Sequence, residues 1–213
     1  MSEAEIGLFE ALYTQKAIRR LKSDPVPDGL IDKMIEAATK APSGGNLQPW
    51  AFIIIKDQET KDRIGVWYRD AWDNTYGKLP QEARTATESF ARVYRSAEHL
   101  AFHLAEAPVF IMVCARSKPP GLSGGVGSAS HYGSIYPAVQ NLLLAARGLG
   151  LGATLTTLHK IHEDEVKELL GMPVEAETIA LVPIGYPKGK YGPAARKPLD
   201  EVVYHERWGL PRP

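Results

Sequence analysis

A domain that mixes helices with strands is predicted by three features of the sequence. Short apolar runs rich in β-branched residues are typical of buried strands, and longer segments with apolar residues three and four positions apart are typical of amphipathic helices. The two kinds of segment alternate along the chain without an internal repeat or linker. At 213 residues the chain is long enough for one large domain, so we expect a single domain over residues 1–213.

Four strands are expected. The run from Ala51 to Ile55 is apolar and is closed by Lys56 and Asp57, which indicates a short buried strand. The four expected strands cover residues 51–55, 109–115, about 152–157 and about 178–186. The single cysteine, Cys114, lies inside the second run, where a buried and inert thiol is predicted.

Helices are expected in the first half of the chain at three places. Asp28 can cap a helix that ends where Pro42 precedes two glycines. Apolar residues three and four positions apart then run from Ile64 to Trp72, and again from Phe90 to Leu104. These segments predict two further amphipathic helices.

The second half begins with a segment rich in glycine, serine and proline. Residues Ser117 to His131 are predicted to form a mobile surface loop, which could serve as a lid. Ser134 can cap the next helix, with Pro137 tolerated in its first turn and Gly148 at its end. A short helix is expected over about residues 163–170.

The tail after Tyr186 is rich in proline and has little helical periodicity. It nevertheless contains apolar side chains: Val202, Val203, Tyr204 and Trp208. Because such residues are unfavourable in water, we expect the tail to wrap over another surface, such as a partner subunit.

Composition excludes several classes of function. Twenty-five basic residues balance 25 acidic ones and no basic run occurs, so nucleic acid is not expected as the main partner. The N-terminal residues are acidic where a signal peptide needs cations, and no apolar segment is long enough to span a membrane. A cytoplasmic protein without membrane contact is therefore expected.

Two patterns that could suggest a site have simpler interpretations. The glycines of Gly148–Gly152 follow a helix and precede a strand, the reverse of a dinucleotide-binding loop, so helix termination is favoured. His99 and His103 lie one helical turn apart with Glu106 beyond them, but without the HExxH arrangement a solvated or partly buried pair is favoured over a metal site. We expect no bound metal.

Two other segments leave a functional interpretation open. In Ala41–Trp50, APSGGNLQPW, the side chains of Ser43, Asn46 and Gln48 lie on a glycine-containing loop before a strand. Such groups can read the polar edge of a planar heterocycle, whereas the alternative is an ordinary turn. In Ala17–Val26, AIRRLKSDPV, the two arginines suit a phosphate monoester, whereas the alternative is a solvated basic turn.

Taken together, the motifs of the chain resemble the nitroreductase family of flavoproteins. The resemblance is carried by AIRRLKSDPVPDGLI, APSGGNLQPW, SIYPAVQNLLLAARGLGLG, IALVPIGYP and ARKPLDEVVYHERWG, in this order. It implies an α+β fold with a central, mostly antiparallel sheet flanked by helices. It also implies an intertwined homodimer with two FMN sites at the subunit interface, in which a tail of about residues 187–213 wraps the partner.

The resemblance also implies which residues hold FMN. Arg19 and Arg196 would bind the phosphate, with Arg20 nearby. The other subunit would supply Pro42, Ser43, Gly44 and Asn46, while Gln48 would contact the flavin or support that loop. Ser134 stands where some members contact the flavin through a glutamine. Gly185 would allow the backbone to approach closely near the same site.

The segment Thr156, Thr157 and Leu158 stands where the family points backbone N–H groups at the reactive edge of the flavin. An N–H from Thr157 near flavin N5 would align that atom for hydride transfer, so no side-chain acid or base is required. The chain departs from the family pattern at Gln15, Ala17 and Ala194. Phosphate binding would then depend on Arg19, Arg20 and Arg196, or on Lys16 if its side chain reaches the phosphate. FMN would be held less tightly than in typical members of the family.

The activity implied by the resemblance is ping-pong transfer of hydride from NADH or NADPH to a nitroaromatic, a quinone or a similar electron-poor small molecule. Some members of the family instead cleave carbon–halogen bonds, degrade flavin or oxidise cyclic peptides. A flavin-binding storage or sensing protein without turnover is an alternative from another class. The sequence leaves the physiological acceptor and the choice between NADH and NADPH open.

Overall fold

The computed structural model describes residues 6–121 and 125–213. Four antiparallel strands form one sheet in the order β1-β2-β4-β3. These are β1 (Trp50–Ile55), β2 (Val109–Ala115), β3 (Gly152–Ala153) and β4 (Glu177–Gly185). The predicted α+β class with an antiparallel central sheet is confirmed.

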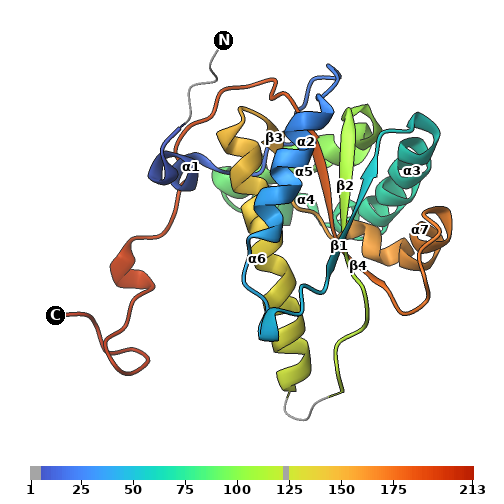
Figure 1. Cartoon of the computed structure of the whole chain (residues 1–213). Coiled ribbons are helices and arrows are strands. Elements are labelled where there is room, and N and C mark those ends of the chain that lie inside the picture. The colour runs from blue at the N-terminus through green and yellow to red at the C-terminus, as the bar shows by residue number, and fades with distance from the viewer. Residues whose placement is uncertain (1–5, 122–124) are drawn as a thin grey trace.

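Helices cover both faces of this sheet (Figure 1). They are α1 (Leu8–Thr14), α2 (Asp28–Thr39), α3 (Gln58–Asn74), α4 (Gln81–Arg84), α5 (Glu88–His103), α6 (Val126–Gly148) and α7 (Glu163–Leu169). Two of them begin at side-chain caps, because Asp57 accepts a hydrogen bond from the N–H of Thr60 at 2.8 Å and Thr87 accepts one from the N–H of Phe90 at 3.0 Å. Asp28 is the first residue of α2 and not its cap, which is Pro27.

The alternation of side chains along β2 divides the core in two. Val109, Ile111 and Val113 pack in a cluster with α2 and α6, whereas Phe110 and Met112 pack in a second cluster with α3 and α5. Every residue of β2 is therefore buried. A strand buried on both faces reads as a continuous apolar run, which is why the sequence predicted it correctly.

The predicted loop over Ser117 to His131 is wrong in its second part. Helix α6 begins at Val126, after Gly125 with φ of 73°, so Ser134 lies inside the helix and does not cap it. Gly127, His131 and Ser134 are buried at helical spacing, and this packing overrides the weak helix propensity of glycine and serine. Residues 122–124 of the predicted loop lie outside the described residues.

The third predicted strand is shorter than expected. Only Gly152 and Ala153 pair continuously with β4, and Thr156 forms an isolated bridge to Leu181. The chain leaves the sheet between these points, so the segment that follows Ala153 is free to approach α3. This departure from regular pairing forms the edge of the candidate site.

The tail after Tyr186 runs away from the helices and sheet (Figure 1). Its root is fixed where the Arg147 guanidinium lies 4.2 Å from the Tyr191 ring and the N–H of Ala194 donates to the Tyr13 carbonyl at 3.0 Å. Beyond this root the tail is exposed, and the Trp208 side chain is 91% accessible. The Tyr204 and Trp208 rings contact each other, with centroids 4.8 Å apart, and Val203 is half-buried. That the tail wraps a partner subunit stays a prediction.

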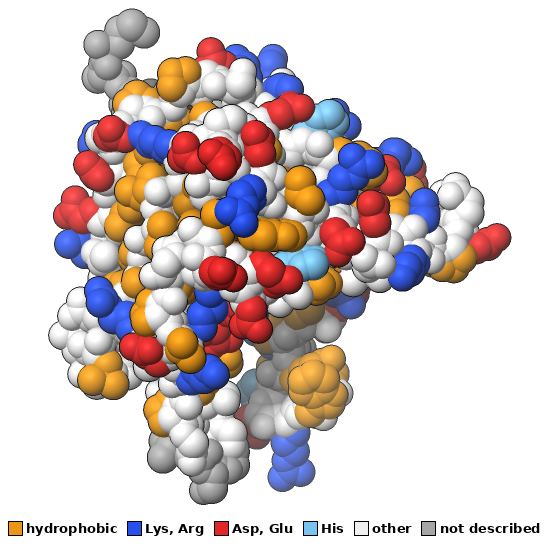
Figure 2. All heavy atoms as spheres, turned by 90° about the vertical axis from the view of Figure 1, so that its right-hand side faces the viewer, with side chains coloured by type: hydrophobic (Ala, Val, Ile, Leu, Met, Phe, Trp, Pro, Cys, Tyr) orange, Lys and Arg blue, Asp and Glu red, His pale blue; other side chains and the backbone are white. Residues whose placement is uncertain are grey.

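The outer face formed by α3 and α7 mixes acidic with basic side chains (Figure 2). This distribution agrees with a formal net charge of zero. No helix among the described residues combines the length and the apolar character that a membrane crossing needs.

Candidate active site

A cavity of about 380 Å³ lies between α3, α5 and the segment that follows β3. Its wall is mostly aromatic and aliphatic, with Tyr68 and Trp72 from α3 and Phe90 and Tyr94 from α5. The opposite wall is the segment from Leu155 to Leu158, and Arg19 contributes a cation. An apolar cavity with a few polar groups at one end is the usual form of a small-molecule site.

The polar end of the cavity is built around Thr156. Its backbone is fixed to β4, because its N–H donates to the Leu181 carbonyl at 3.0 Å and its carbonyl accepts from the Leu181 N–H at 2.9 Å. Its hydroxyl is 2.8 Å from the Tyr68 hydroxyl and accepts from the N–H of Leu158 at 3.4 Å. Helix α3 is thereby tied to the turn that lines the cavity.

Arg19 is a half-buried cation in this cavity. Burial lowers the pKa of its guanidinium, and the guanidinium is nevertheless charged at neutral pH. Among the described residues no carboxylate forms an ion pair with Arg19. Since buried charges are normally paired, this cation is suited to an acceptor on a ligand.

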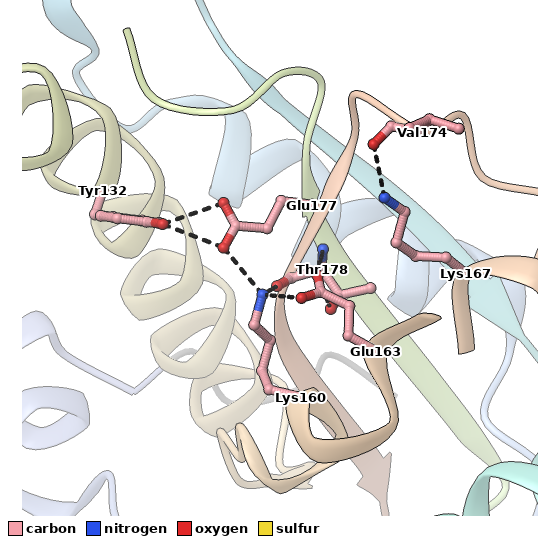
Figure 3. A network of polar contacts seen from close by, with 7 residues as sticks. All are labelled: Tyr132, Lys160, Glu163, Lys167, Val174, Glu177 and Thr178. Atoms are coloured by element: carbon pink, nitrogen blue, oxygen red, sulfur yellow. Dashed lines mark hydrogen bonds and ion pairs between the residues drawn. The ribbon is translucent and has the colours of Figure 1, made fainter. Parts of the chain in front are cut away.

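The turn beyond the cavity is anchored by the network in Figure 3. The Lys160 ammonium lies 2.6 Å from Glu163 Oε2, 2.9 Å from Glu177 Oε1 and 3.0 Å from the Thr178 carbonyl. Tyr132 of α6 donates to the same Glu177 carboxylate at 3.1 Å. Burial alone would lower the pKa of Lys160, but the hydrogen bonds to both carboxylates outweigh burial and raise it.

Removing the cation of this network is expected to destabilise the fold. Lys160→Met leaves two carboxylates facing each other without a counter-charge, so we expect a loss of about 1–3 kcal/mol in the free energy of unfolding. Urea denaturation followed by circular dichroism measures the loss. Lys167→Met is the matched control, because the Lys167 ammonium donates at 2.8 Å to the exposed Val174 carbonyl and, within residues 6–121 and 125–213, pairs with no carboxylate. Equal stability of the two variants would contradict a role for the network.

The loop that the sequence singled out, residues 42–48, is strained and exposed. Gly45, Asn46 and Gln48 have φ values of 57°, 55° and 50°, which is unfavourable for the two residues with side chains. The Ser43 hydroxyl accepts the Gln48 N–H at 3.0 Å and so holds the turn. The Asn46 and Gln48 amides bond each other at 3.3 Å at the surface.

Ser134 connects this loop to α6. Its hydroxyl accepts the N–H of Gly44 at 3.0 Å and donates to the Ser130 carbonyl at 2.7 Å. The loop and the cavity are separate regions of one chain, because the residues that line the cavity include none from 42–48. A single subunit therefore does not bring all the predicted site residues together.

A model of the nitroreductase family matches residues 13–186. The chain belongs to the nitroreductase family. It is 28% identical to an NADH dehydrogenase of Thermus thermophilus over 91% of this chain and 93% of that one. It is 30% identical to iodotyrosine deiodinase 1 of Rattus norvegicus over 92% of this chain and 68% of that one.

Solved structures of the family superpose on this chain. The crystal structure of oxidized iodotyrosine deiodinase bound to FMN and 3-iodo-L-tyrosine has a TM-score of 0.72 and 26% identity, covering 94% of this chain and 99% of that one. A BluB-like flavoprotein from Clostridium difficile has a TM-score of 0.74 at 22% identity, covering 95% of this chain and all of that one. The second likeness shows the shared fold.

The remaining residues predicted from the family lie apart from the cavity. Arg20 lines a separate shallow hollow with His99 and His103, and Arg196 lies on the exposed tail, where its guanidinium donates to the Ala195 carbonyl. Gly185 is close to other backbone, because a Cβ there would lie 3.1 Å from the Lys22 carbonyl and 2.8 Å from Pro108. Their roles toward a cofactor stay predictions.

The aromatic wall of the cavity was not identified from the sequence. Tyr68 and Trp72 belong to a stripe that was interpreted as an ordinary amphipathic face. Both are indeed nearly buried, so the stripe does face inward, but part of it faces a cavity. An unusual number of aromatic residues on two neighbouring helices was the available signal.

Two histidines that the sequence did not single out have buried nitrogen atoms without a partner. They are His131 Nε2 and both ring nitrogens of His159, among the described residues. Burial lowers the pKa of His159 to about 4, so the ring is neutral at physiological pH.

The rings of His99 and His103 stack on each other with centroids 4.3 Å apart. The described residues contain no cluster suited to a metal ion. Cys114 is buried as predicted, and burial raises the pKa of its thiol to about 12.

Proposed function

We propose that this member of the nitroreductase family is an FMN-dependent oxidoreductase that transfers hydride from NADH or NADPH to small electron-poor molecules, such as nitroaromatics or quinones. The observation that carries the proposal is the cavity in which Arg19 meets the Thr156–Leu158 segment. The FMN in the related deiodinase structure supports the choice of cofactor.

The groups present in the cavity fit such a cofactor. Arg19 offers guanidinium donors without a carboxylate partner, and the N–H of Thr157 has no acceptor among the residues that the structure describes. FMN carries ring oxygens and nitrogens and a terminal phosphate that can accept these bonds. The proposed FMN-binding residues are Arg19, Arg20, Pro42, Ser43, Gly44, Asn46, Gln48, Ser134, Thr156, Thr157, Leu158, Gly185 and Arg196.

Bound FMN would supply the hydride acceptor and donor, as flavins do in other oxidoreductases. The chain would bind and orient it: the Thr157 N–H is proposed to lie toward flavin N5, and the aromatic wall would exclude water above it. Lys16 is a further candidate for the phosphate, because its ammonium lies near Gly192 at the root of the tail.

We also propose a homodimer in which each site uses both chains. Residues 42–48 are exposed and lie outside the cavity of their own chain, and the tail carries uncovered apolar side chains. A second copy could bring the loop to the cavity and cover the tail at the same time. This arrangement explains why a single chain leaves both features incomplete.

We expect the purified protein to be yellow and to release FMN, not FAD, on denaturation. Chromatography of the released cofactor identifies it. Anaerobic mixing with NADH and NADPH in a stopped-flow spectrometer is then expected to bleach the flavin absorbance rapidly. A non-catalytic flavin-binding protein would bleach slowly or not at all, and recovery of FAD or of no flavin would contradict the proposal.

Reductive dehalogenation is a second candidate, because the rat relative named iodotyrosine deiodinase 1 is 30% identical. An amino-acid zwitterion needs a carboxylate for its ammonium, but the one charged residue that lines the cavity of the described chain is Arg19. Such a substrate would therefore require a carboxylate from the second chain, whereas an uncharged acceptor would not. Incubation of the reduced protein with 3-iodo-L-tyrosine and measurement of released iodide decides between them.

A further inference from the structure

The cavity contains a second group of hydrogen-bond donors beside Arg19. Tyr68 and Thr156 each carry one hydroxyl hydrogen, and their oxygens are 2.8 Å apart. Only one of the two hydrogens can lie between the oxygens. Whichever hydroxyl donates, the pair therefore keeps one hydrogen that is not used in their mutual bond.

This remaining hydrogen has no acceptor within the described chain. The other bond of the pair is the one in which the Thr156 hydroxyl accepts the Leu158 N–H at 3.4 Å, and this bond uses a lone pair. Both residues line the cavity with Arg19. Burial raises the pKa of Tyr68, so its phenol keeps its proton at neutral pH. The cavity is therefore lined by one O–H donor that no residue of the described chain uses.

The rest of the cavity indicates what accepts from these donors. Its wall is formed by aromatic rings, with Trp72 and Tyr94 centroids 5.3 Å apart and Trp72 and Tyr76 centroids 5.5 Å apart. Such a wall favours a flat ring system, and a free hydroxyl hydrogen at its polar end favours an oxygen conjugated to that ring.

We propose that the Tyr68–Thr156 hydroxyl pair binds an oxygen acceptor conjugated to a planar ring in this cavity, while Arg19 keeps the role toward the phosphate proposed above. The inference rests on the proposed function, and the oxygen has two possible sources: a ring carbonyl of FMN itself, or the carbonyl or nitro group of the electron acceptor. Tyr68 and Thr156 are specificity-determining residues in either case.

The test is a double-mutant cycle of Tyr68→Phe and Thr156→Val. Each single variant keeps one hydroxyl and its hydrogen, so we expect less than about a threefold change in dissociation constant. The double variant has no hydroxyl, and we expect a rise of about three- to tenfold. FMN titration of the apoprotein and equilibrium dialysis of 1,4-naphthoquinone against the flavin-loaded protein measure the two sources separately.

A rise in the dissociation constant of FMN in the double variant assigns the oxygen to the flavin. A rise in the dissociation constant of naphthoquinone alone assigns it to the electron acceptor. Unchanged dissociation constants for both probes would overturn the inference, even if the wild-type protein binds FMN and is bleached by NADH or NADPH. If the wild-type protein binds no FMN, the proposed function fails, and dialysis of naphthoquinone against the flavin-free variants still tests the pair. Tyr132→Phe is the matched control, because its hydroxyl bonds Glu177 outside the cavity.

A second measurement tests the proposal if the double variant fails to fold. Tyrosine labelled with carbon-13 at Cζ gives one signal for Tyr68, which the Tyr68→Phe spectrum identifies. We expect this signal to shift when FMN or 1,4-naphthoquinone is added to the wild-type protein, because the hydrogen bonding of the phenol changes. A signal that stays in place with both probes would also overturn the inference.

Discussion

Removal of residues 194–213 is expected to abolish the proposed dimer and FMN binding together. The truncation deletes Arg196, a proposed phosphate ligand, and the exposed Val202, Tyr204 and Trp208. If the tail covers the partner, its loss exposes apolar surface on both subunits and opens both sites at once. Light scattering gives the mass of the truncated protein, and absorbance gives its flavin content.

The root of the tail provides the internal control for this experiment. The Arg147–Tyr191 contact lies before the cut, so the truncated chain keeps the contacts that attach the root to α6. We therefore expect its circular dichroism spectrum to remain that of a folded protein. A truncated protein that stayed dimeric and yellow would show that the interface lies elsewhere.

Arg19→Ala and Arg196→Ala are each expected to weaken FMN binding about tenfold to a hundredfold. Each substitution would remove the proposed charge-assisted hydrogen bonds to the FMN phosphate, and such bonds contribute roughly 1.5–3 kcal/mol. Titration of the apoproteins with FMN measures the dissociation constants. Arg19→Ala also removes a half-buried cation without a carboxylate partner, so the apoprotein is expected to be as stable as the wild type.

Two variants sharpen the interpretation of the arginine experiment. Arg19→Lys keeps the charge but loses the planar fork, so an intermediate affinity indicates two parallel hydrogen bonds. Arg63→Ala is the control, because Arg63 lies over the Trp67 ring and does not line the cavity. Unchanged affinity in both alanine variants of the proposed ligands would place the phosphate elsewhere.

The strands of the sheet could be predicted from the sequence because their apolar runs differ from the periodic pattern of the helices. β2 and β4 are buried along almost their whole length, so their apolar runs are continuous and unmistakable. The start of α6 was not predictable from composition, because its glycines and serines favour a loop unless their face is buried. The break after Ala153 depends on the bridge between Thr156 and Leu181, which joins distant parts of the chain.

The candidate site was predicted in part. The Arg19 and Thr156–Leu158 segments were identified from motifs, and the structure brings them into one cavity. Tyr68 was missed because a helical apolar stripe has the same pattern whether it faces a core or a cavity. Local motifs also carry no information on distance, so the separation of residues 42–48 and Arg196 from the cavity could come only from the fold.

The burial of β2 on both faces has a consequence for the unfolded chain. Seven consecutive residues, Val109–Ala115, carry no charge and favour extended structure, so they are suited to pair with copies of themselves in aggregates. In the native state β1 and β4 occupy both edges of this strand. Pro108 and Arg116 flank the segment, where a proline and a charge disfavour such association, so we expect substitution of either residue to lower the yield of soluble protein during synthesis.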